Sequence, residues 1–379
     1  MDFEFTSEQI DIQKAALEFA KGEFDQDAVL EYDRDQRFPY SIWKKACELG
    51  FVGVHYPEIY GGQGCGLLEN ALIVETFCQQ DSGMGIALAL SDFGSEMILR
   101  HGSEHQKKRT LPSISHGKAL VTLAFLEEGH SGALLATTAR KSPNGFTING
   151  IKSFVTLGSI ADAMIVVCRT RLDDPHAQST FMLEGSHLGM EVSSMGDKLG
   201  MRMIPVDRVS FNNVLVPGEN AIGHENAGFH QLQGFFDELR IETSAMGVGI
   251  AQGALNTARE YSRKREQFGK AIISFDVTRN KLVDMYMDTE MARLITYKAA
   301  WSFDKGKLDG RAALMAKAIA SGTAYRVAYE AVQIHGGYGY MTEGHIEHFY
   351  RDAKALELFL ETGQIQKNLL ADQIAGQKR

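Results

Sequence analysis

The sequence predicts a mainly α-helical protein with a β domain in its middle, and three patterns along the chain support this fold class. Residues 1–120 and 229–379 place apolar side chains at intervals of three and four, which is the spacing of amphipathic helices. Residues 121–228 instead hold short runs rich in Val, Ile, Phe and Thr, separated by Gly, Pro, Asn and Asp. We therefore expect an N-terminal helical domain (1–120), an antiparallel β-domain (121–228) and a C-terminal four-helix bundle (229–379).

Each segment carries local signals for its own elements. Helical patterning begins at Thr6, a residue type suited to cap a helix, and a glycine-rich turn at residues 50–64 interrupts it. In the C-terminal segment the helical pattern from Phe229 continues for roughly ten turns and contains several glycines, a spacing that indicates close packing against neighbouring helices. The middle segment reads as at least four strands, at 146–156, 161–170, 179–185 and 206–217.

Composition excludes several classes of protein. Of the 379 residues 44% are hydrophobic and 23% charged, and no apolar run approaches the ~18 residues that a membrane span needs. The net charge of -9 argues against a general nucleic-acid role, because phosphate binding requires a basic face. The four cysteines have no C-x-x-C spacing, so we expect no metal site and no disulfide framework. The chain opens with an acidic amphipathic pattern rather than a targeting peptide, and we expect a cytoplasmic protein.

Residues 333–366 contain three motifs in a short window: Gln333-Ile-x-Gly-Gly-x-Gly-Tyr, Tyr350-Arg-Asp-Ala and Thr362-x-Gln-Ile-Gln. Taken alone, the glycines are equally typical of a helix end and turn. The three motifs in register, however, resemble the C-terminal signature of the FAD-dependent acyl-CoA dehydrogenases. That family has the same helical, β, helical order of domains, so the resemblance covers essentially the whole chain. It implies an FAD enzyme that oxidises a CoA thioester, forms a homotetramer and passes electrons to an electron-transfer flavoprotein.

The resemblance also implies which residues hold the adenine and pyrophosphate of FAD. Arg265 would bind the pyrophosphate and Phe268 would pack near the adenine, both across a subunit interface, because the chain carries the family's R-x-x-F-G pattern there. Gln333 and Gly337 would belong to that cross-subunit site, and Thr362 and Gln364 would bind FAD within their own subunit. Basic residues in the last turn of a helix are also ordinary partners of the helix dipole, which is the alternative for Arg265.

Around the flavin ring the family pattern is only partly kept. Gly129 matches, but Leu126 stands where the family has a hydroxyl-bearing Thr, and Gly132-Ala133 replaces Ser-Asp. One lost hydrogen bond of roughly 1 kcal/mol would shift a two-electron potential by only about 20 mV, so flavin binding is not excluded. Phe154 and Thr156 match an aromatic wall and a hydroxyl over the flavin, although the same residues suit an ordinary strand.

Leucines occupy both positions where the family carries its catalytic glutamate. The common position, just before Gly-Thr-x-Gln-Ile-Gln, falls on Leu360, with Glu361 one residue late. The second known position, on the long helix, falls on Leu239, and a one-residue shift turns Glu238 by about 100°, away from the pocket. Leu239 and Leu360 would therefore line the acyl pocket, while Asp237 and Arg240 would lie along the pantetheine or form a surface ion pair.

Asp92 is the candidate for a replacement base. It follows an apolar run in the segment that the family places beside the acyl group, and a carboxylate against an apolar surface tends to have a raised pKa. A capping role for Ser91-Asp92 is the alternative. Loss of the usual glutamate together with this aspartate resembles the family branch that acts on alicyclic thioesters such as cyclohex-1-ene-1-carboxyl-CoA. Two other hypotheses stay open: an ordinary 2,3-dehydrogenase of a short or branched acyl-CoA that uses Glu361, and a thioester binder or oxygen-using relative without dehydrogenase activity.

Overall fold

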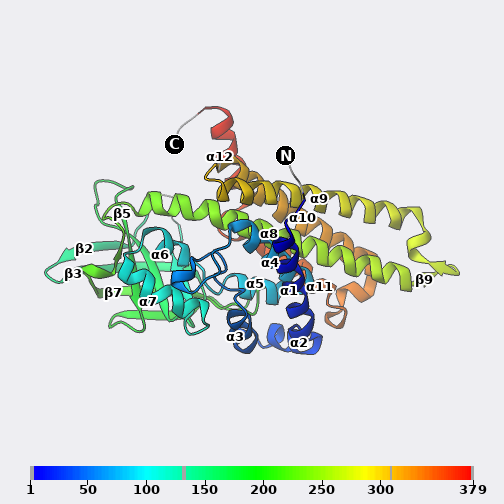
Figure 1. The fold of residues 1–379 in the computed structure, drawn as a ribbon, viewed down its shortest axis with the longest axis horizontal. Helices are drawn as coiled ribbons and strands as arrows, with labels where there is room; N and C mark the ends of the chain where they lie inside the picture. The colour runs from blue at the N-terminus through cyan, green and yellow to red at the C-terminus, as the bar shows by residue number, and fades with distance from the viewer. Residues whose placement is uncertain (1–3, 130–133, 308–309, 377–379) are drawn as a thin grey trace.

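The computed structural model describes residues 4–129, 134–307 and 310–376. A β-sheet forms one end of the molecule and helices form the rest, with the long helix α8 (Gly228–Lys264) running from the sheet to the opposite end (Figure 1). The fold class expected from the sequence is confirmed: helical N-terminal segment, β middle segment, helical C-terminal segment.

The N-terminal segment consists of short helices whose first residues explain where they begin. Thr6 caps the first helix with a reciprocal pair of bonds to Gln9, and Asp25 and Asp81 cap two later helices. The helices are α1 (Ser7–Glu23), α2 (Gln26–Arg34), α3 (Tyr40–Glu48), α4 (Leu67–Gln80), α5 (Ser82–Ala89), α6 (Ser95–His101) and α7 (Glu104–Ser115), with a 3-10 turn η1 (Glu58–Tyr60) inside the glycine-rich segment 50–64.

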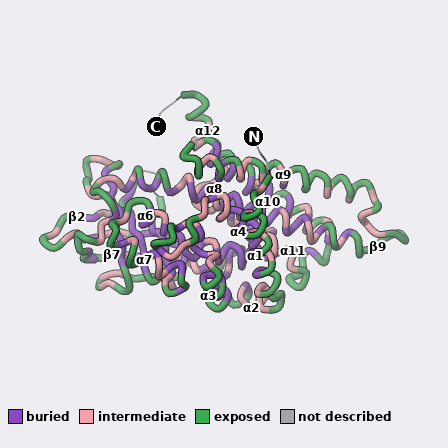
Figure 2. The backbone as a smooth tube through the Cα atoms, in the orientation of Figure 1, coloured by how far each residue is buried: buried purple, intermediate pink, exposed green. Residues whose placement is uncertain are grey.

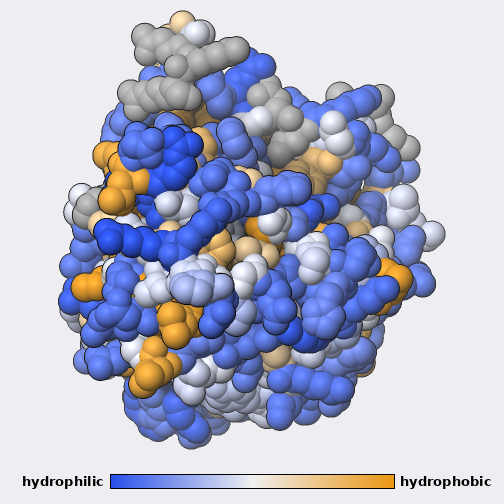
Figure 3. Space-filling view, turned by 90° about the vertical axis from the view of Figure 1, so that its left-hand side faces the viewer, coloured by the Kyte–Doolittle hydropathy of each residue, from blue (hydrophilic) through white to orange (hydrophobic). Residues whose placement is uncertain are grey.

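The middle segment is one sheet with strand order β6-β7-β3-β2-β4-β5-β8, and β1 pairs with β4. Most neighbours are antiparallel as expected, but β1 and β2 run parallel to β4, because the β2–β3 hairpin stands between β1 and β4 in the chain. The strands are β1 (Val121–Ala124), β2 (Thr138–Ser142), β3 (Gly145–Thr156), β4 (Ala163–Arg169), β5 (Gln178–Glu184), β6 (Met190–Ser194), β7 (Val206–Pro217) and β8 (Ala221–Ile222). Seen from this end, the surface is mostly hydrophilic with scattered apolar side chains (Figure 3).

The C-terminal segment packs α9 (Asp276–Asp304), α10 (Gly310–His335), α11 (Ile346–Leu358) and α12 (Gly363–Ile374) with α8. A small hairpin, β9 (Glu266–Gln267) and β10 (Lys270–Ala271), joins α8 to α9 through η3 (Ile272–Ser274). Glycines on α8 permit the close packing that their spacing predicts. A Cβ on Gly247 would lie 2.9 Å from the Ala320 carbonyl of α10, and one on Gly249 would lie 2.4 Å from the Glu75 carbonyl of α4.

One hydrophobic core joins the N-terminal helices to the C-terminal bundle, while the sheet has a separate core between its strands. The buried stretches of α4, α8 and α10 form the interior, and α9 is largely exposed along the outer edge (Figure 2). Over the described ranges, no helix is long and apolar enough to cross a membrane. In the same part of the chain no group of three or more His, Cys, Asp or Glu side chains could hold a metal ion.

Candidate active site

Asp92 lies in the turn between α5 and α6, after the apolar run of α5. Its side chain is buried at 7% exposure, and its Oδ2 accepts a 2.8 Å hydrogen bond from the hydroxyl of Tyr56. Burial and then the nearby Glu96 carboxylate raise the pKa of Asp92 to about 6, although His55 and the Tyr56 hydroxyl oppose the shift. A carboxyl with this pKa can exchange a proton near neutral pH.

Three aromatic rings bring the Asp92 turn against the two leucine positions. The ring of Phe93 lies 5.8 Å from that of Phe235 on α8 and 5.9 Å from that of Phe359. Leu239 follows Phe235 by one helical turn and is 3% exposed, and Leu360 follows Phe359 and packs on the same core. The turn that carries Asp92 is therefore linked to both leucine positions through the ring of Phe93.

Glu361 is bound by two cations, Arg240 at its carboxylate and Lys317 at its backbone carbonyl. Arg240 donates three hydrogen bonds of 2.9, 2.9 and 3.0 Å to the Glu361 carboxylate, and a fourth of 2.7 Å to Asp237. Lys317 from α10 donates to the Glu361 backbone carbonyl at 2.6 Å. Burial lowers the pKa of Lys317 to about 8, although the Glu361 charge raises it. The pair formed by Asp237 and Arg240 is thus part of a buried network, not an ion pair on a helix surface.

The backbone at Leu360 fixes this turn in an uncommon conformation. Leu360 has φ +65°, in the left-handed region that a branched residue enters at a cost. Glu361 follows directly, and its bonds to Arg240 and Lys317 hold the strained turn in place. The side chain at the family's glutamate position is therefore set by a rigid turn.

Two further carboxylates lie nearby on α8. Glu238 is bound by Arg100 of α6 through two 3.0 Å bonds and borders a surface cavity of about 470 Å³. Glu242 accepts a 3.1 Å bond from Asn70 and shares with Asp92 a small cavity of about 10 Å³, room for about one water molecule. Burial raises the pKa of Glu242 well above its usual range, and the Asp92 charge adds to the shift.

On the β-domain side, Phe154 has the geometry of a side chain aimed out of its strand. The register between β3 and β7 shifts between Lys152 and Val155, and Phe154 in this bulge has φ +56° with 54% exposure. Bulges of this kind re-aim a side chain and occur next to active sites. Thr156 is buried, and its backbone carbonyl accepts from Thr122. The expected strand is present, but it is not a regular one at the predicted flavin wall.

Leu126 and Gly129 lie on the connection that follows β1. The Leu126 carbonyl accepts a 2.9 Å bond from the Ser153 amide, which ties this connection to β3, and Gly129 has φ +74°. Beneath them Lys152 and Glu127 form a buried 2.6 Å ion pair. The predicted Gly132-Ala133 difference lies outside the described residues.

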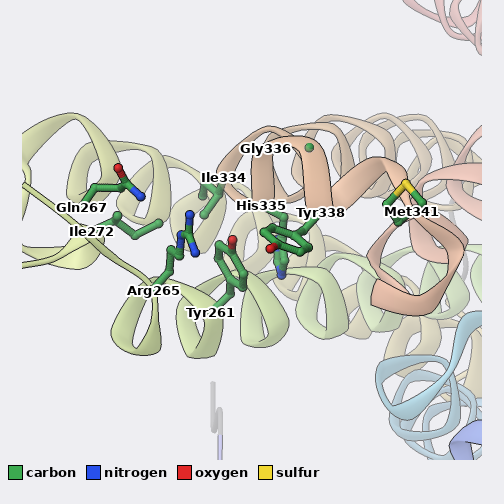
Figure 4. A pocket seen from close by; sticks show the side chains of 10 residues that line it. Tyr261, Arg265, Gln267, Ile272, Ile334, His335, Gly336, Tyr338 and Met341 are labelled. Carbon is green, nitrogen blue, oxygen red and sulfur yellow. The ribbon is translucent and has the colours of Figure 1, made fainter.

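At the far end of α8, Arg265 borders a cavity of about 530 Å³ together with Gly337. Arg265 and Tyr261 rise from the end of α8 toward His335 and Tyr338, as Figure 4 shows, and the guanidinium lies 5.7 Å from the Tyr338 ring centre. A Cβ on Gly337 would meet no atom within 4 Å, so the backbone there is open to an approaching group. An arginine, aromatic faces and exposed glycine backbone are the groups that a nucleotide diphosphate requires.

A neighbouring cavity of about 360 Å³ contains Phe268 and Gln333, and it shares its Gln267, Ile272 and Ile334 walls with the first. Phe268 has φ +52° and is 92% exposed, so its ring contacts little within its own chain. The sequence-predicted residues Arg265, Phe268, Gln333 and Gly337 therefore form one continuous region.

Thr362 and Gln364 lie elsewhere, at the start of α12. Thr362 caps this helix through a 3.4 Å bond to the Ile365 amide, and Gln364 bonds Asn368 at 3.0 Å. Helix α12 and the β9–β10 hairpin stand at well-separated places in Figure 1. One chain thus does not bring the two predicted groups of cofactor residues together. Gln366 is fully buried, and its amide atoms have no hydrogen-bond partner within the described part of the chain.

These residues fit FAD. The large open cavity at Arg265 suits the adenosine diphosphate half, and the outward-aimed Phe154 suits one face of a flavin ring. The orphaned amide of Gln366 beside Thr362 is a buried polar group that requires a partner. A protein that holds a flavin in such a site belongs to the class of flavin-dependent oxidoreductases.

Comparison with known proteins gives the family. Three family models match the chain in order: the acyl-CoA dehydrogenase N-terminal domain over residues 6–118, the middle domain over 127–214 and the C-terminal domain over 226–375. The probable acyl-CoA dehydrogenase YngJ of Bacillus subtilis is 34% identical over 379 residues, covering 99% of this chain and 100% of YngJ. The chain belongs to the acyl-CoA dehydrogenase family.

Two solved structures support the fold and the cofactor. Butyryl-CoA dehydrogenase from Megasphaera elsdenii superposes with a TM-score of 0.95 at 33% identity, covering 99% of this chain and 100% of that one. The FAD complex of PigA superposes with a TM-score of 0.94 at 29% identity, covering 99% of each chain. The protein is an FAD-dependent acyl-CoA dehydrogenase by family, and FAD is its cofactor.

Sequence reasoning did not select three groups that the structure places beside the predicted residues. Tyr56 lies in the glycine-rich turn at 50–64, which was noted only as an interruption of the helical pattern. Glu242 and Lys317 sit on helices among apolar neighbours, and a charged residue within an apolar run was the one available signal.

Proposed function

We propose that this dehydrogenase oxidises an alicyclic CoA thioester, such as cyclohex-1-ene-1-carboxyl-CoA, with Asp92 as the base. One observation carries the proposal: the Glu361 carboxylate is paired with Arg240, whereas Asp92 is buried and hydrogen-bonded to a neutral hydroxyl, in a turn whose Phe93 ring contacts the aromatic rings near both leucine positions. A cation partner makes a carboxylate a weaker base, while burial without one makes it stronger.

The reaction needs a proton acceptor and a hydride acceptor. FAD, when bound, would supply the hydride acceptor. Asp92 takes the proton from a second C–H bond of the acyl group, and the electron pair of that bond becomes the new C=C bond. Leu239 and Leu360 supply an apolar wall that excludes water from the reacting carbons.

The position of Asp92 favours an alicyclic acyl group. It is carried by the α5–α6 turn, a different wall from the Leu360 turn where the family's common base stands. A base on a different wall reaches a different carbon, and a six-membered ring folds its distal C–H bonds back toward such a wall, whereas a linear chain extends past it.

Substitution of each carboxylate separately tests the assignment. Asp92→Asn is expected to abolish flavin bleaching by cyclohex-1-ene-1-carboxyl-CoA, a loss of about 100- to 10,000-fold in the reduction rate. Glu361→Gln is the matched control and is expected to keep bleaching, with lower stability. If instead Asp92→Asn bleaches normally and Glu361→Gln does not, Glu361 is the base and an ordinary 2,3-dehydrogenase of a short or branched acyl-CoA is the correct reading.

A panel of thioesters separates the remaining alternatives. We expect bleaching by the cyclic thioester to be faster than bleaching by butyryl-CoA. A yellow protein that no thioester bleaches would indicate a thioester binder, and a reduced flavin that air reoxidises rapidly would indicate an oxygen-using relative. Slow reoxidation by air and fast reoxidation by an electron-transfer flavoprotein would support that protein as the physiological acceptor.

The proposed assembly is a homotetramer in the cytoplasm. Two observations favour self-association: the two groups of cofactor residues lie apart within one chain, and α9 exposes a helical stripe of large apolar side chains. The stripe consists of Val283, Tyr286, Met287, Met291, Leu294 and Trp301. Asp237 and Arg240 would border the pantetheine of the bound thioester. Sedimentation analysis of the FAD-bound protein measures the number of copies.

A further inference from the structure

The glycine-rich turn at residues 50–64 packs closely around one of its own residues, Tyr56. Tyr56 is fully buried, at 0% exposure. A Cβ on Gly53 would lie 2.5 Å from its ring, and a Cβ on Gly62 would lie 2.2 Å from its backbone carbonyl. Side chains at either position would displace the ring, so the turn holds Tyr56 in one place.

The fixed hydroxyl of Tyr56 has two partners. It lies 2.8 Å from Oδ2 of Asp92 and 2.6 Å from Oγ of Ser95, at the start of α6. A phenol has one proton, so when Tyr56 donates to an ionised Asp92, the Ser95 hydroxyl donates to the phenol oxygen. The turn is thereby linked through this one atom to the aspartate and to the helix that follows it.

We propose that Tyr56 is a positioning residue for Asp92: it fixes one carboxylate oxygen and favours the ionised form of the base. This inference rests on the proposed function, because it acts through Asp92. The hydrogen bond to Tyr56 stabilises the carboxylate, which burial destabilises. After Asp92 takes the proton, the phenol proton can turn to Ser95, so the same contact does not oppose the transfer.

The contact between Tyr56 and Asp92 differs from the contact between Arg240 and Glu361 in the charge of the donor. The donor to the Glu361 carboxylate is the charged guanidinium of Arg240, whereas the donor to Asp92 is a neutral phenol. A phenol holds the oxygen in position with a smaller effect on basicity. The other titratable and charged groups that face Asp92 come from α3, the glycine-rich turn at residues 50–64, α6 and α8: Cys47, His55, Glu96 and Glu242.

The test is Tyr56→Phe, which keeps the ring and removes only the hydroxyl. Without the donor the pKa of Asp92 rises, so the acid limb of the pH profile for flavin reduction should move to higher pH by about one unit. At a pH below the limb the rate should fall about tenfold, and KM for the thioester should stay unchanged.

Tyr60→Phe is the matched control. Tyr60 lies in the same turn, and its hydroxyl bonds the Glu104 carboxylate at 2.9 Å, away from Asp92. This variant should leave the pH profile in place. In an Asp92→Asn background, Tyr56→Phe should cause no further loss of the residual rate, because its effect passes through the aspartate.

An unmoved acid limb in Tyr56→Phe would overturn the inference, and so would an additive loss in the Asp92→Asn background. A lower unfolding midpoint with an unmoved limb would assign Tyr56 a structural role only. Failure of the proposed function has a separate sign, namely normal bleaching in the Asp92→Asn single variant.

Discussion

The buried pair of Lys152 and Glu127 gives a sharp prediction about the stability of the flavin wall. Both side chains are almost fully enclosed, and the Lys152 ammonium lies 2.6 Å from the Glu127 carboxylate. The carboxylate also accepts bonds from the amides of Ala136 and Thr137, at 2.5 and 3.1 Å. Lys152→Met removes the cation and leaves a buried carboxylate with only these two neutral donors.

Removing one member of a buried ion pair costs about 3–5 kcal/mol, because the other charge stays behind unpaired. We expect Lys152→Met to lower the free energy of unfolding by this amount. The double variant with Glu127→Gln should lose less than Lys152→Met alone, because no bare charge remains and the amide oxygen keeps one of the two backbone bonds.

Urea unfolding of wild type, both single variants and the double variant measures this cycle, with FAD in constant excess. The coupling energy should be about 2 kcal/mol or more. Lys152→Met within about 0.5 kcal/mol of wild type would refute the reasoning, since exposed substitutions have effects of that size. Because the pair lies beneath Leu126 and next to the Phe154 bulge, FAD release should quicken in the same order as stability falls.

Three further predictions follow from other parts of the fold. Burial alone would lower the pKa of His348, but the Asp352 and Asp81 carboxylates raise it to about 10. The contribution of the charged His348 to the free energy of unfolding is therefore full below about pH 6.5 and is lost as pH rises through 10. In urea unfolding His348→Gln should differ from wild type at pH 6 and converge with it above pH 10. Arg265→Ala should weaken FAD binding by about 10- to 100-fold in titration of the apoprotein, whereas the exposed Arg263→Ala should not. Leu294→Glu should shift sedimentation toward smaller species without changing the helical content, and an unchanged assembly would remove the apolar stripe of α9 from the interface.

The fold class and the leucine at the expected glutamate position could be predicted from the sequence because both depend on local patterns. Helical and strand periodicity give the three segments, and fixed spacing from the Arg-Asp and Gln-Ile-Gln motifs places Leu360 at the glutamate position. The parallel pairing of β1 with β4 was not predictable, because it depends on where a hairpin is inserted rather than on any residue of either strand.

Partners far apart in the chain explain most of what was missed. Arg240 and Glu361 are 121 residues apart, and no pattern in either segment predicts that their side chains form a contact. The sequence therefore predicts Glu361 as a candidate base without showing that Arg240 binds its carboxylate. Tyr56 and Asp92, 36 residues apart, illustrate the same difficulty at shorter range. Pairing between distant polar groups is set by packing, which periodicity does not encode.

Helix α8 also fixes the distance between Arg240 and Arg265. Arg240 near its beginning and Arg265 at its end are about 25 residues apart, which at 1.5 Å per residue is about 38 Å along one rigid axis. Inserting or deleting a single residue between them would change this length by only about 1.5 Å, but it would rotate one arginine against the other by about 100°. Gly247, Gly249 and Gly253 seat the helix against its neighbours and prevent it from absorbing that rotation by turning as a whole. The number of residues in α8 is therefore a more rigid requirement than the identity of most of its surface side chains.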